Sequence, residues 1–203
     1  MYIPAFNQFT DRQEVINFMQ RYSFATIITA PNGIPEATHL PLLVKQENDR
    51  IYLLSHFAKA NKQANDIVDN TCLVIFTEPH AYISPKHYEK EESVPTWNYI
   101  AIHAYGKATL LDNEDDKKQL LEQTINFYDA EYLKQWDNLS EDYKLKMMRG
   151  IVAFKIEVSD LQAKQKLSQN RTDKEKENII NSLGKSTDTN EKEIAAYMAR
   201  LQK

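Results

Sequence analysis

Residues 55–63 bring polar and cationic side chains to the junction between a predicted strand and a predicted helix. Ser55 and Asn61 supply hydrogen-bonding groups, and Lys59 and Lys62 supply two positive charges. Donors and cations around a helix N-terminus suit a phosphate, both through charge and through free backbone N–H groups. The alternative is that Asn61 only caps the helix and that the lysines are solvated.

Residues 94–99 alternate aromatic and polar side chains. In a strand, Trp97 and Tyr99 lie on one face, while Thr96 and Asn98 alternate with them. Such an arrangement offers ring surface and hydrogen-bonding groups to a planar ligand. The alternative is that the aromatic side chains fill the core of a barrel.

A third polar stretch runs from Lys166 to Arg171 with the sequence Lys-Leu-Ser-Gln-Asn-Arg, directly after the last predicted strand. Its cationic and hydroxyl side chains, including Ser168, suit an anionic ligand. The alternative interpretation is a plain polar linker.

Other common catalytic patterns are missing from the sequence. The chain contains no GxSxG, P-loop or GxGxxG motif and only 4 glycines, so side chains rather than a glycine-rich loop must hold any phosphate. No histidine stands in a metal-ligand spacing with a second ligand, and we therefore predict no metal site. The histidines are His39, His56, His80, His87 and His103.

Most of the predicted elements that position these stretches are short strands. Helical spacing predicts helices over 11–21, 61–68, 112–136 and 141–149. Strands are predicted over 24–29, 36–44, 51–55, 72–76, 96–111 and 151–158, with residues 77–95 as a long loop. A turn at 31–33 makes the first two strands a hairpin, in which Pro41 indicates a bulge or an edge.

The C-terminal region is predicted to be helical. Thr172 and Glu175 form a capping-box pattern, and a last helix is predicted over 191–201. Short strands at hairpin-like intervals, with helices between and outside them, favour a mainly β, α+β architecture, namely an antiparallel barrel with peripheral helices.

The charge balance argues against a protein whose whole surface binds nucleic acid. The 203 residues carry 25 Lys+Arg and 29 Asp+Glu, a net charge of -4. The single cysteine, Cys72, lies in an apolar run and is expected to be a buried, reduced thiol. No hydrophobic signal sequence or membrane-spanning run is present, so we expect a cytoplasmic protein with no membrane partner.

Strings spread over nearly the whole chain resemble the PaiB family of FMN-binding negative transcriptional regulators, which is related to the pyridoxamine-phosphate-oxidase-like split barrels. The matching strings are Met1-Tyr-Ile-Pro4, Ala37-Thr-His-Leu-Pro41, His56-Phe-Ala-Lys-Ala-Asn61, Val74-Ile-Phe76, Pro79-His-Ala-Tyr-Ile-Ser-Pro85, Val94-Pro-Thr-Trp-Asn-Tyr99, His103-Ala-Tyr-Gly106, Gly150-Ile-Val152 and Lys166-Leu-Ser-Gln-Asn-Arg171.

The resemblance implies an FMN-binding split β-barrel over residues 1–160. Residues 161–203 are then a polar linker and C-terminal helices that pack on the barrel or on a partner subunit. The resemblance also implies a homodimer with FMN at the subunit interface, where residues 56–62 and the Trp97 string come from different subunits.

Site residues follow from the same strings. Asn61 and Lys62 fall where related flavoproteins use a Ser-Arg pair for the FMN phosphate, and Lys lacks the bidentate fork of Arg. No catalytic residue is assigned. The expected cofactor-binding residues are His56, Lys59, Asn61, Lys62, Trp97, Asn98, Lys166, Ser168 and Arg171.

Function is predicted as negative transcriptional regulation through flavin or small-ligand sensing. In residues 172–201 the positive and negative charges nearly cancel, which does not fit a DNA recognition helix, so direct DNA binding is not expected. Three alternatives stay open: an FMN-dependent oxidoreductase acting on a small substrate, a direct DNA-binding repressor, and a haem-binding protein with an axial histidine.

Overall fold

The strands form one seven-stranded sheet in the order β2-β1-β5-β6-β7-β4-β3. The computed structural model describes residues 1–202, and these divide into two compact units. Residues 16–76 and 103–161 form the central unit, and residues 1–15, 77–102 and 162–202 form the terminal unit. The mainly β, α+β class that the sequence predicts is confirmed.

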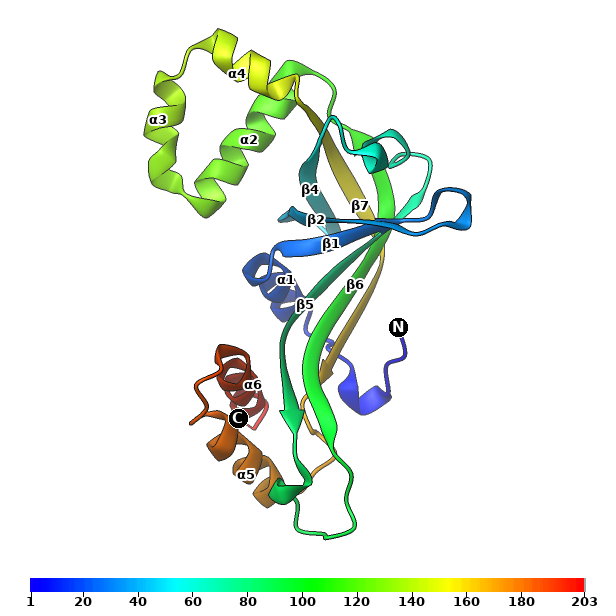
Figure 1. The fold of residues 1–203 in the computed structure, drawn as a ribbon, viewed down its shortest axis with the longest axis vertical. Helices are drawn as coiled ribbons and strands as arrows, with labels where there is room; N and C mark the ends of the chain where they lie inside the picture. The colour runs from blue at the N-terminus through cyan, green and yellow to red at the C-terminus, as the bar shows by residue number, and fades with distance from the viewer. Residues whose placement is uncertain (203) are drawn as a thin grey trace. The chain divides into compact units, whose positions relative to one another are not determined.

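The central unit contains four strands of its own, which are β1 (Phe24–Thr29), β2 (Glu36–Pro41), β3 (Leu43–Glu47) and β4 (Arg50–Ala58). Three longer strands run from this unit into the terminal unit, namely β5 (Thr71–Ile83), β6 (Thr96–Leu110) and β7 (Ile151–Lys166) (Figure 1). The pairs β1–β2, β1–β5, β3–β4 and β4–β7 are antiparallel.

The predicted hairpin is present, and Pro41 ends the edge strand β2 as expected. The predicted single strand over 36–44 is wrong, because the chain breaks at Leu42 into β2 and β3. Proline has no N–H for a sheet ladder. The next residue, Leu42, is fully buried and donates its N–H to the Ser23 carbonyl oxygen at 2.9 Å instead.

Three strands are longer than predicted, and the first is β4, which runs from Arg50 to Ala58 instead of over 51–55. The other two are β5 and β7. Strand β5 continues through Pro79 to Ile83, so the first part of the predicted loop over 77–95 is wrong. Strand β7 continues to Lys166 instead of ending at residue 158. In both cases polar side chains or proline interrupt the apolar alternation, although the backbone stays extended.

The core of the central unit is aromatic and aliphatic. Phe57 and Phe154 pack with ring centroids 5.0 Å apart, and both are fully buried. Helix α1 (Arg12–Arg21), predicted over 11–21, buries Ile16 and Phe18 in this unit. Cys72 is a buried free thiol, as expected, and burial raises its pKa to about 11.

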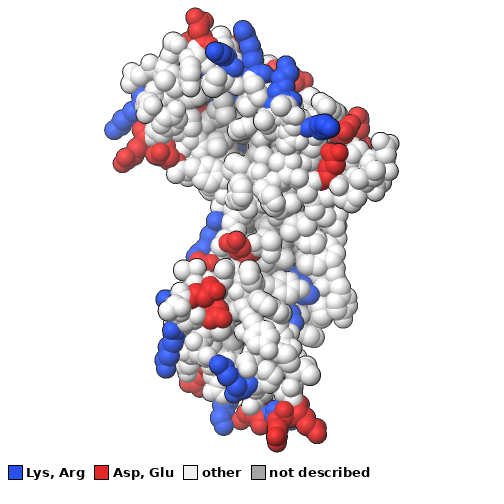
Figure 2. Space-filling view, in the orientation of Figure 1, with Lys and Arg blue, Asp and Glu red and all other residues white. Residues whose placement is uncertain are grey.

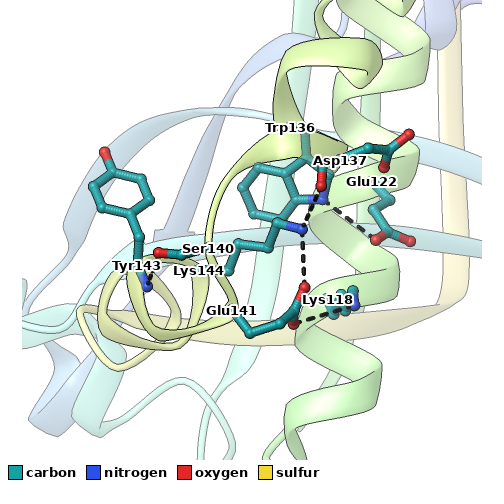
Figure 3. Close-up of polar contacts among 8 residues, drawn as sticks. All are labelled: Lys118, Glu122, Trp136, Asp137, Ser140, Glu141, Tyr143 and Lys144. Carbon is teal, nitrogen blue, oxygen red and sulfur yellow. Dashed lines mark hydrogen bonds and ion pairs between the residues drawn. The ribbon is translucent and has the colours of Figure 1, made fainter.

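Three helices follow β6 in the central unit, namely α2 (Glu114–Tyr128), α3 (Leu133–Asn138) and α4 (Glu141–Met148). The single helix predicted over 112–136 is broken at Asp129, where the backbone is not helical. Lys144 is buried and donates to Glu141 at 3.0 Å, and its Nζ lies 5.6 Å from the centre of the Trp136 ring (Figure 3). The indole N–H of Trp136 donates to Glu122, so these contacts join the three helices.

The terminal unit carries the C-terminal helices α5 (Asp173–Leu183) and α6 (Thr189–Arg200), which lie side by side (Figure 1). The predicted capping box is present, since Thr172 accepts from the Glu175 N–H and Glu175 accepts from the Thr172 N–H. Glu175 also accepts from the Glu89 N–H at 3.0 Å. That bond fixes the start of α5 against the loop between β5 and β6.

Gly106 marks a close approach between β6 and β7. A Cβ atom at this position would lie 2.2 Å from the Glu157 carbonyl oxygen and 2.7 Å from Ile156 Cγ2. We therefore expect Gly106→Ala to lower the free energy of unfolding by about 3 kcal/mol, because the clash is with backbone. Urea unfolding measures this change.

Gly150→Ala is the matched control. A Cβ atom at Gly150 would be 3.2 Å from the Met147 carbonyl oxygen, so the expected change is within about 1 kcal/mol. Equal effects of the two substitutions would contradict the close approach at Gly106.

Candidate functional site

The segment after β4 is fixed by its own hydrogen bonds. Lys59 donates its N–H to the Gly150 carbonyl oxygen at 2.8 Å. The helix predicted over 61–68 is only a short 3-10 turn, η3 (Lys62–Asn65), followed by turns. Asn61 caps it, accepting from the Gln63 N–H at 3.0 Å. Asn61 is therefore a cap, as one interpretation expects, but of a 3-10 turn instead of the predicted helix.

Gln63, which the sequence analysis did not single out, ties this segment to the β1–β2 hairpin. Its side chain is buried and accepts from the Thr38 hydroxyl at 2.7 Å. Its amide nitrogen lies 3.1 Å from the Thr29 hydroxyl and 3.2 Å from the Glu36 carbonyl oxygen. Asn61 also donates to Thr38, at 3.0 Å. The loop carrying Lys59 and Lys62 is thus preorganised.

Lys59 and Lys62 are exposed, and no carboxylate among residues 1–202 is paired with either of them. A four-residue 3-10 turn has no appreciable helix dipole, so any phosphate affinity here rests on the two ammonium groups. His56 lies at the end of β4 and is half-buried, and burial lowers its pKa. The imidazole is therefore neutral at pH 7.

A cleft of about 380 Å³ lies within the terminal unit and is called the terminal-unit cleft below. Residues 2–7, 94–99 and 164–171 contribute to its lining. It brings together four of the predicted site residues, Asn98, Lys166, Ser168 and Arg171. These residues come from the start of β6 and from the end of β7 with the segment after it.

Three cations line the terminal-unit cleft. Lys164 is buried and donates to the Tyr2 carbonyl oxygen at 3.1 Å. Its ammonium lies 5.1 Å from the centre of the Tyr99 ring. Lys166 donates to the Thr96 hydroxyl. No Asp or Glu of the described residues lines this cleft, so its positive charge is not neutralised locally.

Arg171 supplies the third cation. Its guanidinium carbon lies 3.7 Å from the centre of the Tyr88 ring, which is a close cation–π contact. Stacking of this kind fixes the plane of the guanidinium while leaving its N–H groups available. The interpretation of residues 166–171 as a plain linker therefore does not describe this part of the chain.

Buried polar side chains complete the lining. Ser168 has a left-handed backbone (φ 59°) and donates to the Asn98 side-chain oxygen at 3.1 Å. The Asn98 amide in turn lies 3.4 Å from the Met198 sulfur. Asn7 is 3% exposed, and its Oδ1 has no hydrogen-bond partner among residues 1–202. One lining residue of the cleft thus has a buried acceptor that lacks a donor.

Trp97 lies apart from this lining. The residue is 51% exposed, and its ring lies 5.8 Å from that of His80 and 5.9 Å from that of Tyr82, measured between ring centroids. An indole this exposed does not fill a barrel core, so that alternative is wrong for Trp97. Together these rings make an exposed aromatic cluster on β5 and β6.

The nine predicted residues therefore fall into two groups. His56, Lys59, Asn61 and Lys62 belong to the central unit, and the other five belong to the terminal unit. The sequence analysis missed Lys164, although it stands two residues before Lys166 and alternation along a strand predicts a shared face. Asn7 and Gln63 had no local signal, because their roles depend on residues far away in the chain.

Residues 1–202 contain neither a membrane-spanning helix nor a metal-binding cluster. No helix there is long and apolar enough to cross a membrane. No group of three or more His, Cys, Asp or Glu side chains in that range is arranged to hold a metal ion.

The sequence matches known proteins over nearly its whole length. The model of the family described as “Putative FMN-binding domain” matches residues 1–160. The “Protease synthase and sporulation protein PAI 2” of Bacillus subtilis is 42% identical over 202 residues, which cover 98% of this chain and 96% of that protein. The resemblance inferred from the sequence strings is confirmed.

Solved structures with low sequence identity share the fold. A FAD- and haem-binding protein of Mycobacterium smegmatis superposes with a TM-score of 0.63 at 13% identity, covering 78% of this chain and 73% of that one. A flavocytochrome of Azotobacter vinelandii gives 0.59 at 14% identity, covering 76% and 67%. These likenesses support the split-barrel fold and nothing finer.

The Gln63 network yields a stability prediction. Gln63→Leu leaves the Thr29 and Thr38 hydroxyls and the Glu36 carbonyl oxygen without their shared partner. We expect a loss of about 3 kcal/mol in the free energy of unfolding, because each buried polar group left unpaired is costly. The exposed Gln46→Leu is the control, expected to change stability by less than about 0.5 kcal/mol. Similar losses in both variants would refute the network.

Burial of His56 yields a pH prediction. Its folded-state pKa lies below the unfolded value of about 6.5, so protonation favours unfolding. The contribution of His56 to stability is intact above that value and is lost as the pH falls below it. Ring resonances in an NMR titration, assigned with His56→Gln, should titrate below the ordinary range. Titration at or above the ordinary value would show the inference to be wrong.

Proposed function

The chain belongs to the FMN-binding domain family matched over residues 1–160, and it is 42% identical to the PAI 2 protein of Bacillus subtilis over 98% of its length; we propose that it binds FMN through residues 56–62 and acts as a flavin-dependent regulator. The observation that carries this proposal is the fixed loop after β4, which displays two lysines without acidic partners. FMN is the cofactor that family membership assigns, and the loop suits its phosphate.

Charge and preorganisation support this loop as the phosphate site. A phosphate monoester carries nearly two negative charges at neutral pH, and two ammonium groups on one short loop match them. The bonds of Asn61 and Gln63 hold the loop before any ligand arrives, so little ordering entropy is lost on binding. Lysine contributes a point charge without the bidentate geometry of arginine, so the affinity for the phosphate depends on Lys59 and Lys62 together.

Two other predicted flavin neighbours, His56 and Trp97, have defined roles in the proposal. Bound FMN supplies one- and two-electron redox chemistry. Neutral His56, directly before the loop, offers one donor and one acceptor to a polar edge of the ligand. Trp97, through its exposed ring, offers stacking surface in a homodimer whose partner subunit supplies the phosphate loop.

Regulation through ligand or redox sensing, rather than through direct DNA reading, fits the distribution of charge. On the face drawn in Figure 2, Lys and Arg are interspersed with Asp and Glu. On α5, Lys176 pairs with Asp173 at 3.2 Å, and Lys174 pairs with Glu89 at 3.2 Å. A DNA recognition helix needs cations free for phosphates. The regulatory role itself is supported by the name of the Bacillus subtilis relative, which connects that protein with protease synthesis and sporulation.

The proposal is tested by flavin retention. The purified chain is incubated with excess FMN, desalted and examined for the two visible absorption bands of oxidised flavin. Fluorescence titration then gives the affinities of FMN and of riboflavin, which lacks the phosphate. We expect Lys59→Ala/Lys62→Ala to weaken FMN binding by about tenfold or more and to leave riboflavin binding unchanged, because only the phosphate contact is lost.

Lys146→Ala, an exposed lysine of the same unit, is the matched control and should bind both flavins as the natural chain does. Light scattering on the same samples should give twice the chain mass. Failure to retain flavin, or equal weakening for FMN and riboflavin, would count against the phosphate loop. Rapid reoxidation by a small substrate after NAD(P)H reduction would favour the oxidoreductase alternative, and a haem absorption band would favour the haem alternative.

A further inference from the structure

The terminal-unit cleft has an electrostatic character opposite to that of the whole chain. The chain has a net charge of -4, yet Lys164, Lys166 and Arg171 line one cleft without a carboxylate from residues 1–202. A cation with reduced access to water is costly unless an opposite charge approaches it. The cleft is therefore selective for an anion.

The number and the chemistry of these cations favour a ligand group with two negative charges. Lys164 is 8% exposed and is held by a carbonyl oxygen and by aromatic rings. Lys166 is held by a neutral hydroxyl, and Arg171 by a ring face. Each retains N–H donors for a ligand. A phosphate monoester and a dicarboxylate share the required charge.

Aromatic side chains next to the cations favour a ligand with a planar ring. Tyr2 is 83% exposed and Phe6 is 55% exposed, and both line the cleft together with Tyr99. Exposed rings beside an anion site provide stacking surface for an unsaturated ligand. The volume of about 380 Å³ is at the small end for ligand sites, which suits a molecule built on one ring.

The buried acceptor in the lining adds a further requirement. Asn7 Oδ1 is enclosed without a donor from residues 1–202, whereas the Asn98 and Ser168 side chains are bonded to each other. A buried acceptor without a donor costs free energy, which a ligand N–H or O–H recovers. A hydroxyl or ring N–H on the ligand would bond this acceptor once the enclosed Asn7 side chain turns toward the cleft.

We propose that the terminal-unit cleft is a ligand site in its own right, which binds a small planar organic dianion that also carries a hydrogen-bond donor. In one respect this rests on the proposed function, which assigns the flavin phosphate to residues 56–62 and so leaves Lys166 and Arg171 for a different anion.

Calorimetric titration of the full chain saturated with FMN tests the site. The probes are phenyl phosphate, phthalate, inorganic phosphate and the neutral compound benzyl alcohol. We expect the two aromatic dianions to bind, inorganic phosphate to bind at least about tenfold more weakly because it lacks the ring, and benzyl alcohol not to bind. Tighter binding of phenyl phosphate would indicate a phosphate monoester as the natural ligand, and tighter binding of phthalate would indicate a dicarboxylate. The 2-hydroxy derivative of the preferred probe should bind more tightly.

Variants locate the site. Lys166→Ala and Arg171→Ala should each weaken the preferred probe by about tenfold or more, because a charge-assisted hydrogen bond is lost. Lys166→Arg should retain most of the affinity, which separates loss of charge from loss of folding. Lys192→Ala, an exposed lysine of the same unit, is the control and should bind normally. Melting temperatures of all variants identify any that fail to fold.

Flavin retention in the same variants separates this inference from the proposed function. Loss of probe binding with flavin retained supports the cleft, and so does probe binding in a chain that retains no flavin. Absence of aromatic dianion binding to the natural chain overturns it. So does unchanged binding in folded Lys166→Ala and Arg171→Ala. Competition between FMN and the probe, with flavin lost in these variants, would mean that the cleft serves the flavin and would also overturn the inference.

Discussion

The buried amide of Gln63 is the contact on which the geometry of the central-unit site depends. It joins the 3-10 turn after β4 to both strands of the β1–β2 hairpin, through a hydroxyl on each strand and a backbone carbonyl. A side-chain amide can act in this way because it donates and accepts at once. Lys59 and Lys62 therefore stand on a loop with a fixed backbone while their ammonium groups stay in water. A rigid backbone that carries solvated positive charges is the arrangement expected of a preorganised anion-binding site.

The terminal unit reaches a similar electrostatic result by different means. Its three cations are held by neutral groups, namely a carbonyl oxygen, a hydroxyl and aromatic faces. Elsewhere in the same unit, cations are paired with acids, as Lys174 is with Glu89. Acidic side chains therefore pair with cations in this unit, but no described Asp or Glu lies in the lining of the cleft. Leaving three charges unpaired lowers stability, and proteins usually accept such a cost at functional sites.

Local sequence signals predicted the fold class and several elements well. The capping box at Thr172 and Glu175 is formed by residues three apart, so neighbours alone determine it. The signal failed where distant contacts decide the structure. Strand β5 continues through Pro79. The segment after Asn61 forms a short 3-10 turn whose backbone bonds span three residues, while its side chains are bonded to the distant hairpin. In the candidate site, most of the charged residues were found from their type, although Lys164 was missed, whereas Gln63 and Asn7 became visible only through their burial.

The family match ends at a different residue from the strand β7 that it enters. The family model ends at residue 160, inside a strand that continues to Lys166. A fragment cut at that boundary would sever β7 and discard every cation of the terminal-unit cleft. Recombination or gene fusion at the same point could exchange this cleft for another sequence while keeping the recognisable family signature. Proteins grouped by that signature can therefore differ in which ligand they respond to.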